Sequence, residues 1–274
     1  MPELPEVETI AGGLRHLVNG RVITDVSIPG AHLVRGNQNR LEELIGRRIL
    51  DVGRRGKLLI MDLNGQGRLV FHLRMTGRLG LWPSALENVR HIHLLLALDN
   101  ASTLFFQDQR KFGTCAYFAE GEIEAWPYYA GLGPEPLQIS AADFAARLRG
   151  KKGRIKAVLL DQKFIVGIGN IYADESLFLA RIHPATPAHR LTSHQMRRLH
   201  GAIQDVLTRA IAAGGSSIRD YRTAEGLVGS FQDGFQAYGR TGLPCPRCGR
   251  AIQTAKIAGR TSCFCPRCQQ NRNA

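Results

Sequence analysis

Four cysteines near the end of the chain limit its possible structures more than any other part of the sequence. Cys245-x-x-Cys248 and Cys265-x-x-Cys268 form two C-x-x-C pairs with sixteen residues between them. Each short turn can direct two thiolates at one tetrahedral centre, and two such pairs at this separation are typical of zinc sites. The intervening segment is too short to bury a core of its own, so the metal would supply its folding energy. Four thiolates fill the coordination sphere, and the sequence therefore predicts one structural Zn²⁺.

The other two cysteines do not share this spacing. Cys263 lies near the second pair, but Cys263-x-Cys265 lacks the two-residue gap, so we leave Cys263 outside the ligand set with its role open. Cys115 stands in an apolar run and is expected to be a small core residue. The alternative interpretation of the four paired cysteines is that they are unrelated reduced thiols. The N-terminus, MPELPEVETI, has no basic or apolar leader pattern, so we expect a reducing cytoplasm rather than secretion.

Positive charge is concentrated in two segments. Lys and Arg number 36 against 23 Asp and Glu, a net charge of +13. Residues 241–274 carry six basic residues and no acid, and residues 147–156 carry six more, so the two segments hold twelve of the thirteen excess charges. Such a local footprint favours nucleic acid as the partner over a membrane. No apolar run approaches the length needed to span a bilayer. The alternative for each run is an ordinary solvated face.

The texture of the chain changes along its length. Apolar residues at Val7, Ile10, Leu14 and Leu17 predict a leading helix. Short β-type runs follow over residues 21–119, as in an antiparallel sandwich or barrel. A Gly- and Pro-rich stretch at 120–140 is interpreted as a linker. The remainder is divided as follows: helices near 141–148, 155–162, 171–180 and 193–212, and a loop at 214–230.

A glycine-rich turn precedes one of these helices. Gly167 and Gly169 permit a tight turn with exposed backbone N–H groups, and Asn170 is a natural N-cap residue. Asp174 and Glu175 are then expected near the positive end of the helix dipole. Such a helix start can hold a phosphate, although any capped helix shares part of this pattern.

Several motifs occur together in a fixed order, namely PELPEVET, RRGKLL, HLRMTG, QDQRKFG, GIGNIYADE and QAYGRTGLPCPRCG. With the four-cysteine tail, the whole chain closely resembles the bacterial formamidopyrimidine-DNA glycosylases. The resemblance implies an α+β fold, with an N-terminal β-sandwich and leading helix (1–130), a helical domain with a helix–two-turn–helix element (131–235) and a zinc ribbon (236–274). It implies a monomer that binds damaged double-stranded DNA in a basic cleft between domains, without a required protein partner, in the bacterial cytosol or nucleoid.

The resemblance also implies a bifunctional glycosylase and abasic-site lyase of base excision repair, acting on 8-oxoguanine and formamidopyrimidines. Removal of Met1 would expose Pro2, whose secondary amine is partly neutral near pH 7 and serves as the Schiff-base nucleophile. Glu3 would be the proton donor and Glu6 a supporting carboxylate. Lys57 and Arg260 would be the proton donors for β- and δ-elimination. On sequence alone, Lys57 is equally an edge-strand residue facing solvent.

The remaining roles implied by the resemblance concern DNA contacts. His72, Lys156, Asn170 and Arg260 would bind the backbone, which supplies affinity and orientation. The target nucleotide must leave the duplex, and Met75, Arg110 and Phe112 would fill the gap, with Arg110 bonded to the orphaned cytosine. Without the family, Met75 and Phe112 would be ordinary strand core. The loop at 214–230 takes the place of the family's lesion-covering loop.

Two alternatives stay open. An endonuclease VIII-type relative shares the Pro2 chemistry but prefers oxidised pyrimidines. The leucine of PELPEVET and the set Met75, Arg110 and Phe112 favour the formamidopyrimidine branch. A non-catalytic zinc-ribbon DNA-binding protein would share the charge and the cysteines, but it has no need of Pro2 followed by Glu3.

Overall fold

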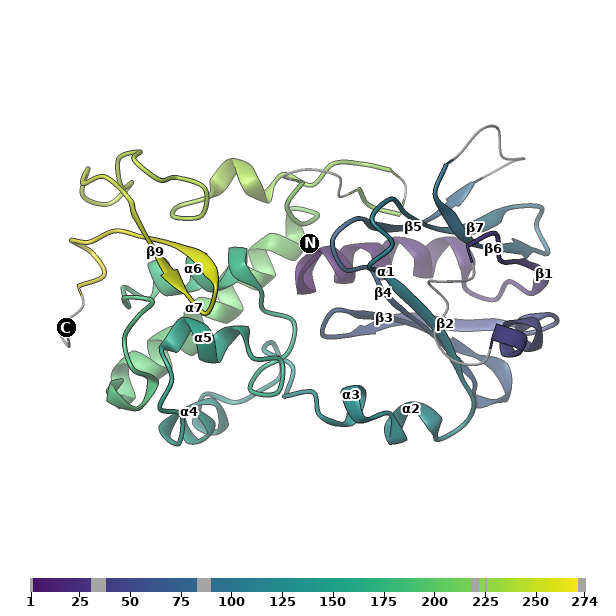
Figure 1. The fold of residues 1–274 in the computed structure, drawn as a ribbon, viewed down its shortest axis with the longest axis horizontal. Coiled ribbons are helices and arrows are strands. Elements are labelled where there is room, and N and C mark those ends of the chain that lie inside the picture. The colour runs from purple at the N-terminus through teal and green to yellow at the C-terminus, as the bar shows by residue number, and fades with distance from the viewer. Residues whose placement is uncertain (1, 31–37, 83–89, 218–221, 225, 271–274) are drawn as a thin grey trace. The chain divides into compact units, whose positions relative to one another are not determined.

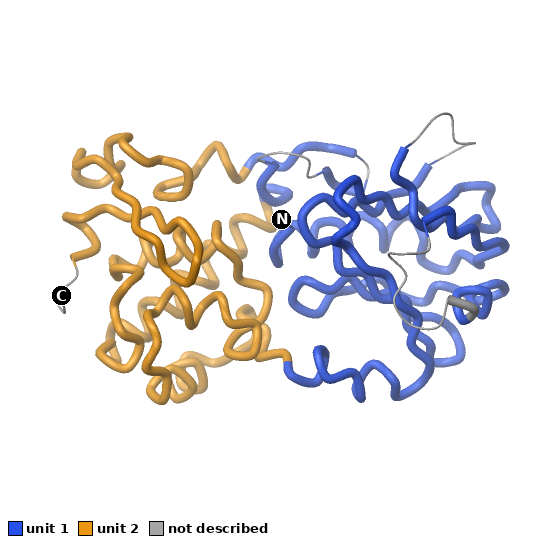
Figure 2. The backbone as a smooth tube through the Cα atoms, viewed as in Figure 1, with its two compact units in different colours: residues 1–131, 213–230 blue, residues 132–212, 231–274 orange. Residues whose placement is uncertain are grey.

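The computed structural model describes residues 2–30, 38–82, 90–217, 222–224 and 226–270 of the chain (Figure 1). Contacts divide the chain into two compact units (Figure 2). Unit 1 comprises Met1–Gly131 and Ala213–Ser230, and unit 2 comprises Leu132–Ala212 and Phe231–Ala274. The loop predicted at 214–230 thus groups with the N-terminal part, and the cysteine-rich tail groups with the helices. The division into three domains at 130 and 235 stays a prediction.

Unit 1 begins with the predicted helix, α1 (Leu4–Val18). Leu4, Val7, Ile10 and Leu14 are fully buried along one face of it, which is the face that the helical spacing indicated. A capping box starts the helix: the Glu3 side chain accepts from the N–H of the third helical residue, and that residue's side chain accepts from the Glu3 N–H.

Two four-stranded antiparallel sheets follow, in the orders β1-β6-β7-β5 and β2-β3-β4-β8. Their bounds are β1 (Ile23–Ser27), β2 (Ile49–Arg55), β3 (Leu58–Leu63), β4 (Arg68–His72), β5 (Gly77–Trp82), β6 (Ile92–Leu98), β7 (Thr103–Asp108) and β8 (Thr114–Phe118). Six of these strands lie in the predicted apolar runs. The pattern of apolar residues did not indicate β1 or β5. In β1 only one residue is fully buried, and β5 contains two glycines.

The two sheets and α1 share one hydrophobic core. Phe71 of β4 and Phe106 of β7 meet edge to face, with ring centroids 5.5 Å apart, and Leu14 of α1 belongs to the same buried cluster. The helix contacts β2 and β3 of one sheet and β5 of the other. The predicted N-terminal sandwich with a leading helix is therefore confirmed.

The stretch interpreted as a linker is partly helical, so that interpretation was wrong for its first half. It forms the short helices α2 (Glu122–Ala125) and α3 (Pro127–Ala130), which belong to unit 1. Trp126 between them stacks on Phe118 of β8 at 5.2 Å, and Glu122 pairs with Arg40 at 2.9 Å. Local packing of aromatic residues overrides a composition that favours a loop.

Unit 2 contains the four predicted helices and a hairpin. The helices are α4 (Ala141–Arg149), α5 (Ile155–Leu160), α6 (Asn170–Leu179) and α7 (Ser193–Ala212), and the hairpin strands are β9 (Gln253–Ile257) and β10 (Arg260–Phe264). Short 3₁₀ turns lie at Ala188–Arg190 and Phe231–Gly234 in unit 2, and at Gln38–Leu44 and Asn64–Gln66 in unit 1. Within unit 2, α6 packs against α5, α7 and β10. In the described parts of both units, no helix combines the length and apolar character that crossing a membrane requires.

Candidate functional site

The start of α1 fixes the residues to which the sequence assigns the chemistry. Pro2 and Glu3 are both buried, and Glu3 is 3% exposed. The backbone N–H of Glu3 donates to Glu6 Oε2 at 2.8 Å, while the Glu3 carboxylate caps the helix from the other direction. These reciprocal bonds hold the peptide that follows Pro2 in one conformation.

Glu6 also binds a segment far along the chain. Its Oε1 accepts hydrogen bonds from the Ser216 backbone N–H at 2.8 Å and from Ser216 Oγ at 3.3 Å. Gly215 makes this approach possible, because its φ is +80° and an added Cβ would lie 3.0 Å from Glu6 Cγ and Oε1. The sequence placed Glu6 in the site but did not single out Ser216, for which the Gly-Gly-Ser-Ser run was the available signal.

Hydrogen bonds join the two ends of the segment Ala213–Ser230. Ser230 N donates to Ala213 O at 3.0 Å, and Gly229 N donates to Ser217 Oγ at 2.9 Å. Ala224 is buried in the sandwich core. Leu227 and Val228, by contrast, are 65% and 61% exposed. The predicted lesion-covering part of this loop includes residues 218–221 and 225, which lie outside the described residues.

Lys57 and His72 are neighbours at the end of the β3–β4 pair, where His72 pairs with Leu58. Both side chains are buried, at 7% and 6% exposure, so Lys57 is not the solvent-facing edge residue of the alternative interpretation. Burial, with the cations Arg74 and Lys57 nearby, lowers the pKa of His72 to about 3. Its Nδ1 accepts from the Arg74 N–H at 3.1 Å, so the neutral ring carries its proton on Nε2 and can donate there.

Met75, Arg110 and Phe112 lie together on the surface of unit 1. Arg110 Nη1 is 3.3 Å from Met75 Sδ, and the Arg110 guanidinium carbon is 4.8 Å from the Phe112 ring centroid. Met75 is 40% exposed and Phe112 is 51% exposed, which excludes the interpretation of both as strand core. Large exposed apolar side chains around an arginine are suited to insertion between bases.

A residue that the sequence reasoning missed organises this trio. Asp108 is completely buried at the end of β7, and its Oδ2 accepts from the backbone N–H groups of Phe112 at 2.8 Å and Gly113 at 2.7 Å. Its Oδ1 accepts from the Arg110 N–H at 3.2 Å and from the Thr76 hydroxyl. An acid just after an apolar strand and before a turn was the signal, since Asp commonly bonds the backbone of the following turn.

In unit 2, the glycine-rich turn and the hairpin come together. Gly169 is the N-cap of α6 and Asn170 is the first helical residue, which corrects the predicted cap by one position. Asn170 Nδ2 donates to Thr261 O at 3.1 Å. The hairpin turn consists of Ala258 and Gly259, both with positive φ, and exposed Arg260 is the first residue of β10.

Lys156 does not lie where a phosphate contact requires it. Its side chain is fully buried, and Nζ is 2.7 Å from Asp174 Oδ1 and 3.0 Å from Thr261 O. The expected direct contact of Lys156 with DNA is therefore not supported by this structure, because the ammonium is already paired away from solvent. Burial raises the pKa of Asp174 to about 6, and Lys156 limits that rise.

The two acids of α6 serve packing rather than the helix dipole. Asp174 Oδ2 accepts from Cys263 N at 2.9 Å, which ties β10 to the helix. Glu175 Oε1 accepts from the N–H groups of Ala237 at 2.9 Å and Tyr238 at 2.8 Å. Both acids are buried beyond the first helical turn, so the predicted dipole role was wrong.

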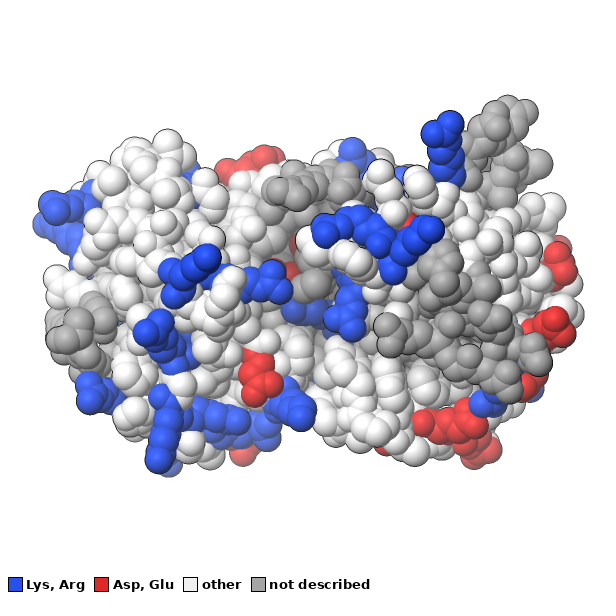
Figure 3. Space-filling model, in the orientation of Figure 1, with Lys and Arg blue, Asp and Glu red and all other residues white. Residues whose placement is uncertain are grey.

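The basic segments divide between structural and surface roles. Arg147 donates to Phe164 O and Lys163 O, and Arg247 donates to Phe178 O at 2.9 Å. Other Lys and Arg side chains remain on the surface, and Figure 3 shows several across the face of unit 2 that it displays. Arg147 and Arg247 are also exposed, whereas the buried, paired charge of Lys156 is not available to a polyanion.

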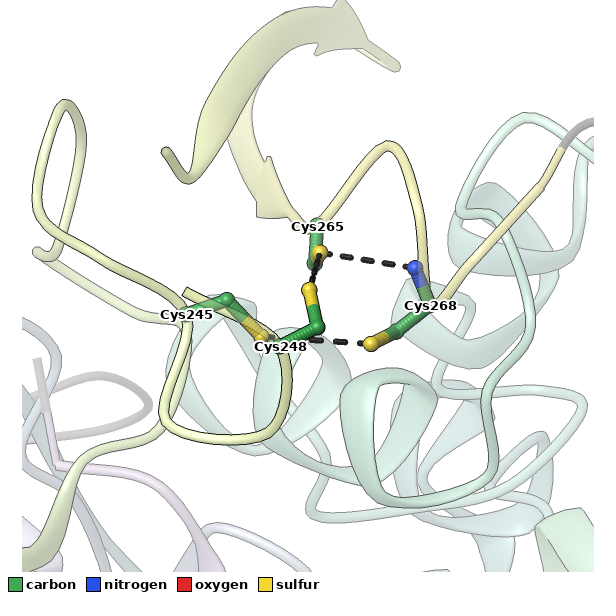
Figure 4. A group of neighbouring side chains, drawn as sticks. All are labelled: Cys245, Cys248, Cys265 and Cys268. Carbon is green, nitrogen blue, oxygen red and sulfur yellow. Dashed lines mark hydrogen bonds between the residues drawn. The ribbon is translucent and has the colours of Figure 1, made fainter. Parts of the chain in front are cut away.

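The four predicted cysteines converge on one point (Figure 4). Sγ atoms are 3.5 Å apart for Cys248 and Cys265 and 3.9 Å apart for Cys245 and Cys268, and all four lie within 4.8 Å of one another. A tetrahedral zinc with Zn–S bonds of about 2.3 Å requires S–S separations of about 3.8 Å. The thiol set therefore fits zinc.

Cys263 lies outside this set. Its Sγ is 3.9 Å from Thr241 Oγ1, and its N–H binds Asp174. Among the described residues, one group of three or more His, Cys, Asp or Glu side chains is close enough together to hold a metal. That group is the four cysteines, and Cys263 is not part of it.

Comparison with known families agrees with this geometry along the chain. Residues 1–115 match the formamidopyrimidine-DNA glycosylase N-terminal domain, and residues 132–222 match the formamidopyrimidine-DNA glycosylase H2TH domain. Residues 242–271 match the zinc finger found in FPG and IleRS. The formamidopyrimidine-DNA glycosylase of Streptococcus pyogenes serotype M28 is 44% identical, over 99% of this chain and 100% of that protein. The one of Chloroflexus aurantiacus is 46% identical, over 95% and 94%.

Solved structures give the same result. The Lactococcus lactis Fpg in complex with DNA containing an abasic site has a TM-score of 0.91 and 37% identity, covering 98% of this chain and 100% of that one. The MutM (FPG) protein of Thermus thermophilus has a TM-score of 0.88 and 43% identity, covering 98% of each. The chain therefore belongs to the formamidopyrimidine-DNA glycosylase family, the DNA glycosylases of base excision repair, and carries that family's zinc finger with one structural zinc.

Proposed function

We propose that the protein removes oxidised purines, 8-oxoguanine and formamidopyrimidines, from double-stranded DNA and then cleaves the strand. After removal of Met1, the neutral Pro2 amine attacks the sugar C1′. The glycosidic bond between C1′ and the base nitrogen breaks, and the base leaves with a proton. The Pro2 nitrogen then gives up its proton, and its lone pair forms a C1′=N iminium as the C1′–O4′ bond opens and O4′ is protonated. Loss of a C2′ proton expels the 3′ phosphate, and a second elimination expels the 5′ phosphate.

Three further residues are assigned proton-transfer roles in this scheme. Glu3 protonates O4′ as the ring opens, which requires an acid adjacent to the nucleophile. Lys57 serves the β-elimination and Arg260 the δ-elimination as proton donors. Glu6 supports the site by holding the Glu3 backbone, a role for which its 2.8 Å bond to Glu3 N is the evidence.

DNA recognition is assigned to both units. His72, Asn170 and Arg260 bind the backbone, with neutral His72 donating from Nε2. Met75 and Phe112 fill the space left by the extruded nucleotide, and Arg110 bonds the orphaned cytosine. The protein works as a monomer without a protein partner, and its genomic substrate leads us to expect it at the bacterial nucleoid.

The observation that carries the proposal is the placement of Pro2. It immediately precedes a buried Glu3 whose backbone and side chain are both fixed by the capping box of α1. A non-catalytic zinc-ribbon protein has no need of a proline amine held beside a buried carboxylate.

Borohydride trapping on duplex DNA with 8-oxoguanine opposite cytosine tests the covalent step. The mass of the N-terminal peptide first establishes that Met1 has been removed. We expect a covalent adduct with the wild-type protein, none with Pro2→Gly, and a normal yield with Pro5→Ala, which changes the other proline of the motif. No adduct from correctly processed protein would overturn the enzymatic proposal, and normal trapping by Pro2→Gly would overturn the assignment of the nucleophile.

Substrate preference is tested separately. Excision of 8-oxoguanine opposite cytosine is compared with excision of thymine glycol under single-turnover conditions. We expect clear preference for 8-oxoguanine, whereas preference for thymine glycol would assign the chain to the endonuclease VIII-type activity.

A further inference from the structure

A polar cavity of about 530 Å³ lies within unit 2, at the end of α6 that is remote from Asn170. Its lining includes Arg181 after α6, Arg198 of α7 and Arg267 between the last two zinc ligands. None of the described residues that line it is acidic. Because α6 rises about 1.5 Å per residue, its two ends are about 15 Å apart, and the cavity is separate from the expected phosphate contact at Asn170.

The arginines of this cavity have no acidic partner among the residues that line it in the described part of the chain. Arg198 Nε is buried and has no hydrogen-bond partner among the described residues. Burial and the charges of Arg181 and Arg247 lower the pKa of Arg198. Cations gathered without an acid repel one another, and a bound anion would relieve both the repulsion and the unmet hydrogen bond.

Arg181 occupies a backbone position that does not favour it. Ile182 N donates to Leu177 O at 3.0 Å and Arg181 N donates to Phe178 O at 3.1 Å, the bond pattern of a Schellman motif. Arg181 has the left-handed φ of 52°, at the position where glycine is favoured. Glycine would adopt this φ without steric cost, so an arginine at this position points to a use for its guanidinium.

Compensation of the α6 dipole does not account for this cluster. Arg247 already covers the carbonyl end of α6 by donating to Phe178 O at 2.9 Å and Leu179 O at 3.3 Å. The cavity is also lined by Thr192 and Gln195, which cap the start of α7 through reciprocal side-chain bonds to each other's N–H at 2.9 and 3.2 Å. The positive end of a 20-residue helix, with no acid in its first turn, therefore faces the same space.

We propose that this cavity binds a phosphoryl group of a small anionic ligand, such as pyrophosphate or the phosphates of a nucleotide, through Arg181, Arg198 and Arg267. Guanidinium groups match phosphate oxygens with paired donors. The volume lies within the range of small-molecule sites. A concave cavity of this size suits a terminal phosphate better than the continuous backbone of a duplex. The site is independent of the glycosylase chemistry.

Calorimetric titration of the zinc-loaded full-length protein with inorganic pyrophosphate tests the proposal. The titration is run in the presence of saturating duplex DNA, which occupies the nucleic-acid surface. We expect Arg181→Gly and Arg198→Ala each to raise the Kd about tenfold or more, because each removes charge-assisted bonds. Arg181→Gly suits the left-handed backbone, so loss of binding in that variant does not reflect misfolding.

Arg197→Ala is the matched control, because Arg197 is exposed on the same helix and does not line the cavity. Its Kd should stay within twofold of the wild-type value, which corresponds to a change in binding free energy of about 0.4 kcal/mol or less. No saturable binding of pyrophosphate by the wild-type protein would overturn the proposal, as would equal affinity in all three variants. Weaker duplex binding by Arg181→Gly with unchanged pyrophosphate binding would also overturn it, by assigning the cavity to the DNA backbone.

Discussion

Glu6 Oε1 accepts a hydrogen bond of 2.8 Å from the backbone N–H of Ser216, although 210 residues separate the two in sequence. The same carboxylate holds Glu3 N through its other oxygen. One buried side chain thus fixes both the peptide after Pro2 and the beginning of the loop Ala213–Ser230. The nucleophile and the loop are positioned by a single group.

Glu6→Gln should disturb both connections. An amide presents an N–H₂ group to one of two backbone donors, which leaves a buried donor unsatisfied and costs about 1–3 kcal/mol of unfolding free energy. We expect this loss in urea unfolding, together with slower borohydride trapping. Ser216→Ala is the control, because it removes the 3.3 Å hydroxyl bond to Glu6 and keeps the backbone N–H that donates to the same oxygen. Equal effects of the two substitutions would contradict the central role of Glu6.

Asp108→Asn should loosen the surface trio without touching DNA directly. An amide cannot accept at both positions, so the turn that carries Arg110 and Phe112 loses at least one of its buried anchors. We expect the preference for cytosine over adenine opposite 8-oxoguanine to fall about tenfold, the value of one lost charge-assisted bond.

Asp99→Asn is the matched control for that measurement, because Asp99 is exposed and lies 4.0 Å from Arg21 in a surface pair. It should leave the opposite-base preference unchanged. An Asp108→Asn protein with wild-type preference would show that the trio keeps its geometry without this carboxylate.

His72 should make the protein less stable as the pH falls. Its folded-state pKa is about 3, below the ordinary value of 6.5, so the unfolded chain takes up the proton first. The contribution is fully present above pH 6.5 and is lost as the pH falls toward 3, by at most about 1.4 kcal/mol per pH unit. His72→Asn keeps an acceptor for Arg74 N but does not titrate, so urea unfolding from pH 7 to 4 should show a flatter pH dependence. A His72→Asn protein with the wild-type pH dependence would contradict this contribution of His72.

Removal of zinc should unfold the ribbon. The four thiols hold the two ends of the β9–β10 segment, and structural zinc contributes about 10–16 kcal/mol of apparent binding free energy in comparable small sites. A chelator should release one zinc per chain, increase amide exchange in β9 and β10, and weaken DNA binding, because Arg260 begins β10. Retained affinity after complete metal removal would exclude a role of the ribbon in DNA binding.

Features that depend on residues close together in the chain could be predicted from the amino-acid sequence. The spacing of two cysteine pairs specifies a tetrahedral metal site, because the ligands are close in the chain and their geometry is local. The period of Val7, Ile10 and Leu14 specifies α1, since a helix is a local structure with one buried face. The joint order of the motifs specifies the family, and hence the residues to which the chemistry is assigned.

Which polar residues are buried and bonded within the protein depends on contacts between segments that are distant in the chain. Lys156 belongs to a basic run, but an acid on another helix removes it from the surface. Asp174 and Glu175 look like helix-start acids, yet both bind backbone N–H groups from distant segments. Asp108 and Ser216 were not singled out, because their roles depend on partners that folding brings to them. Burial and long-range hydrogen bonds are properties of the packed chain, and no local pattern in the sequence encodes them.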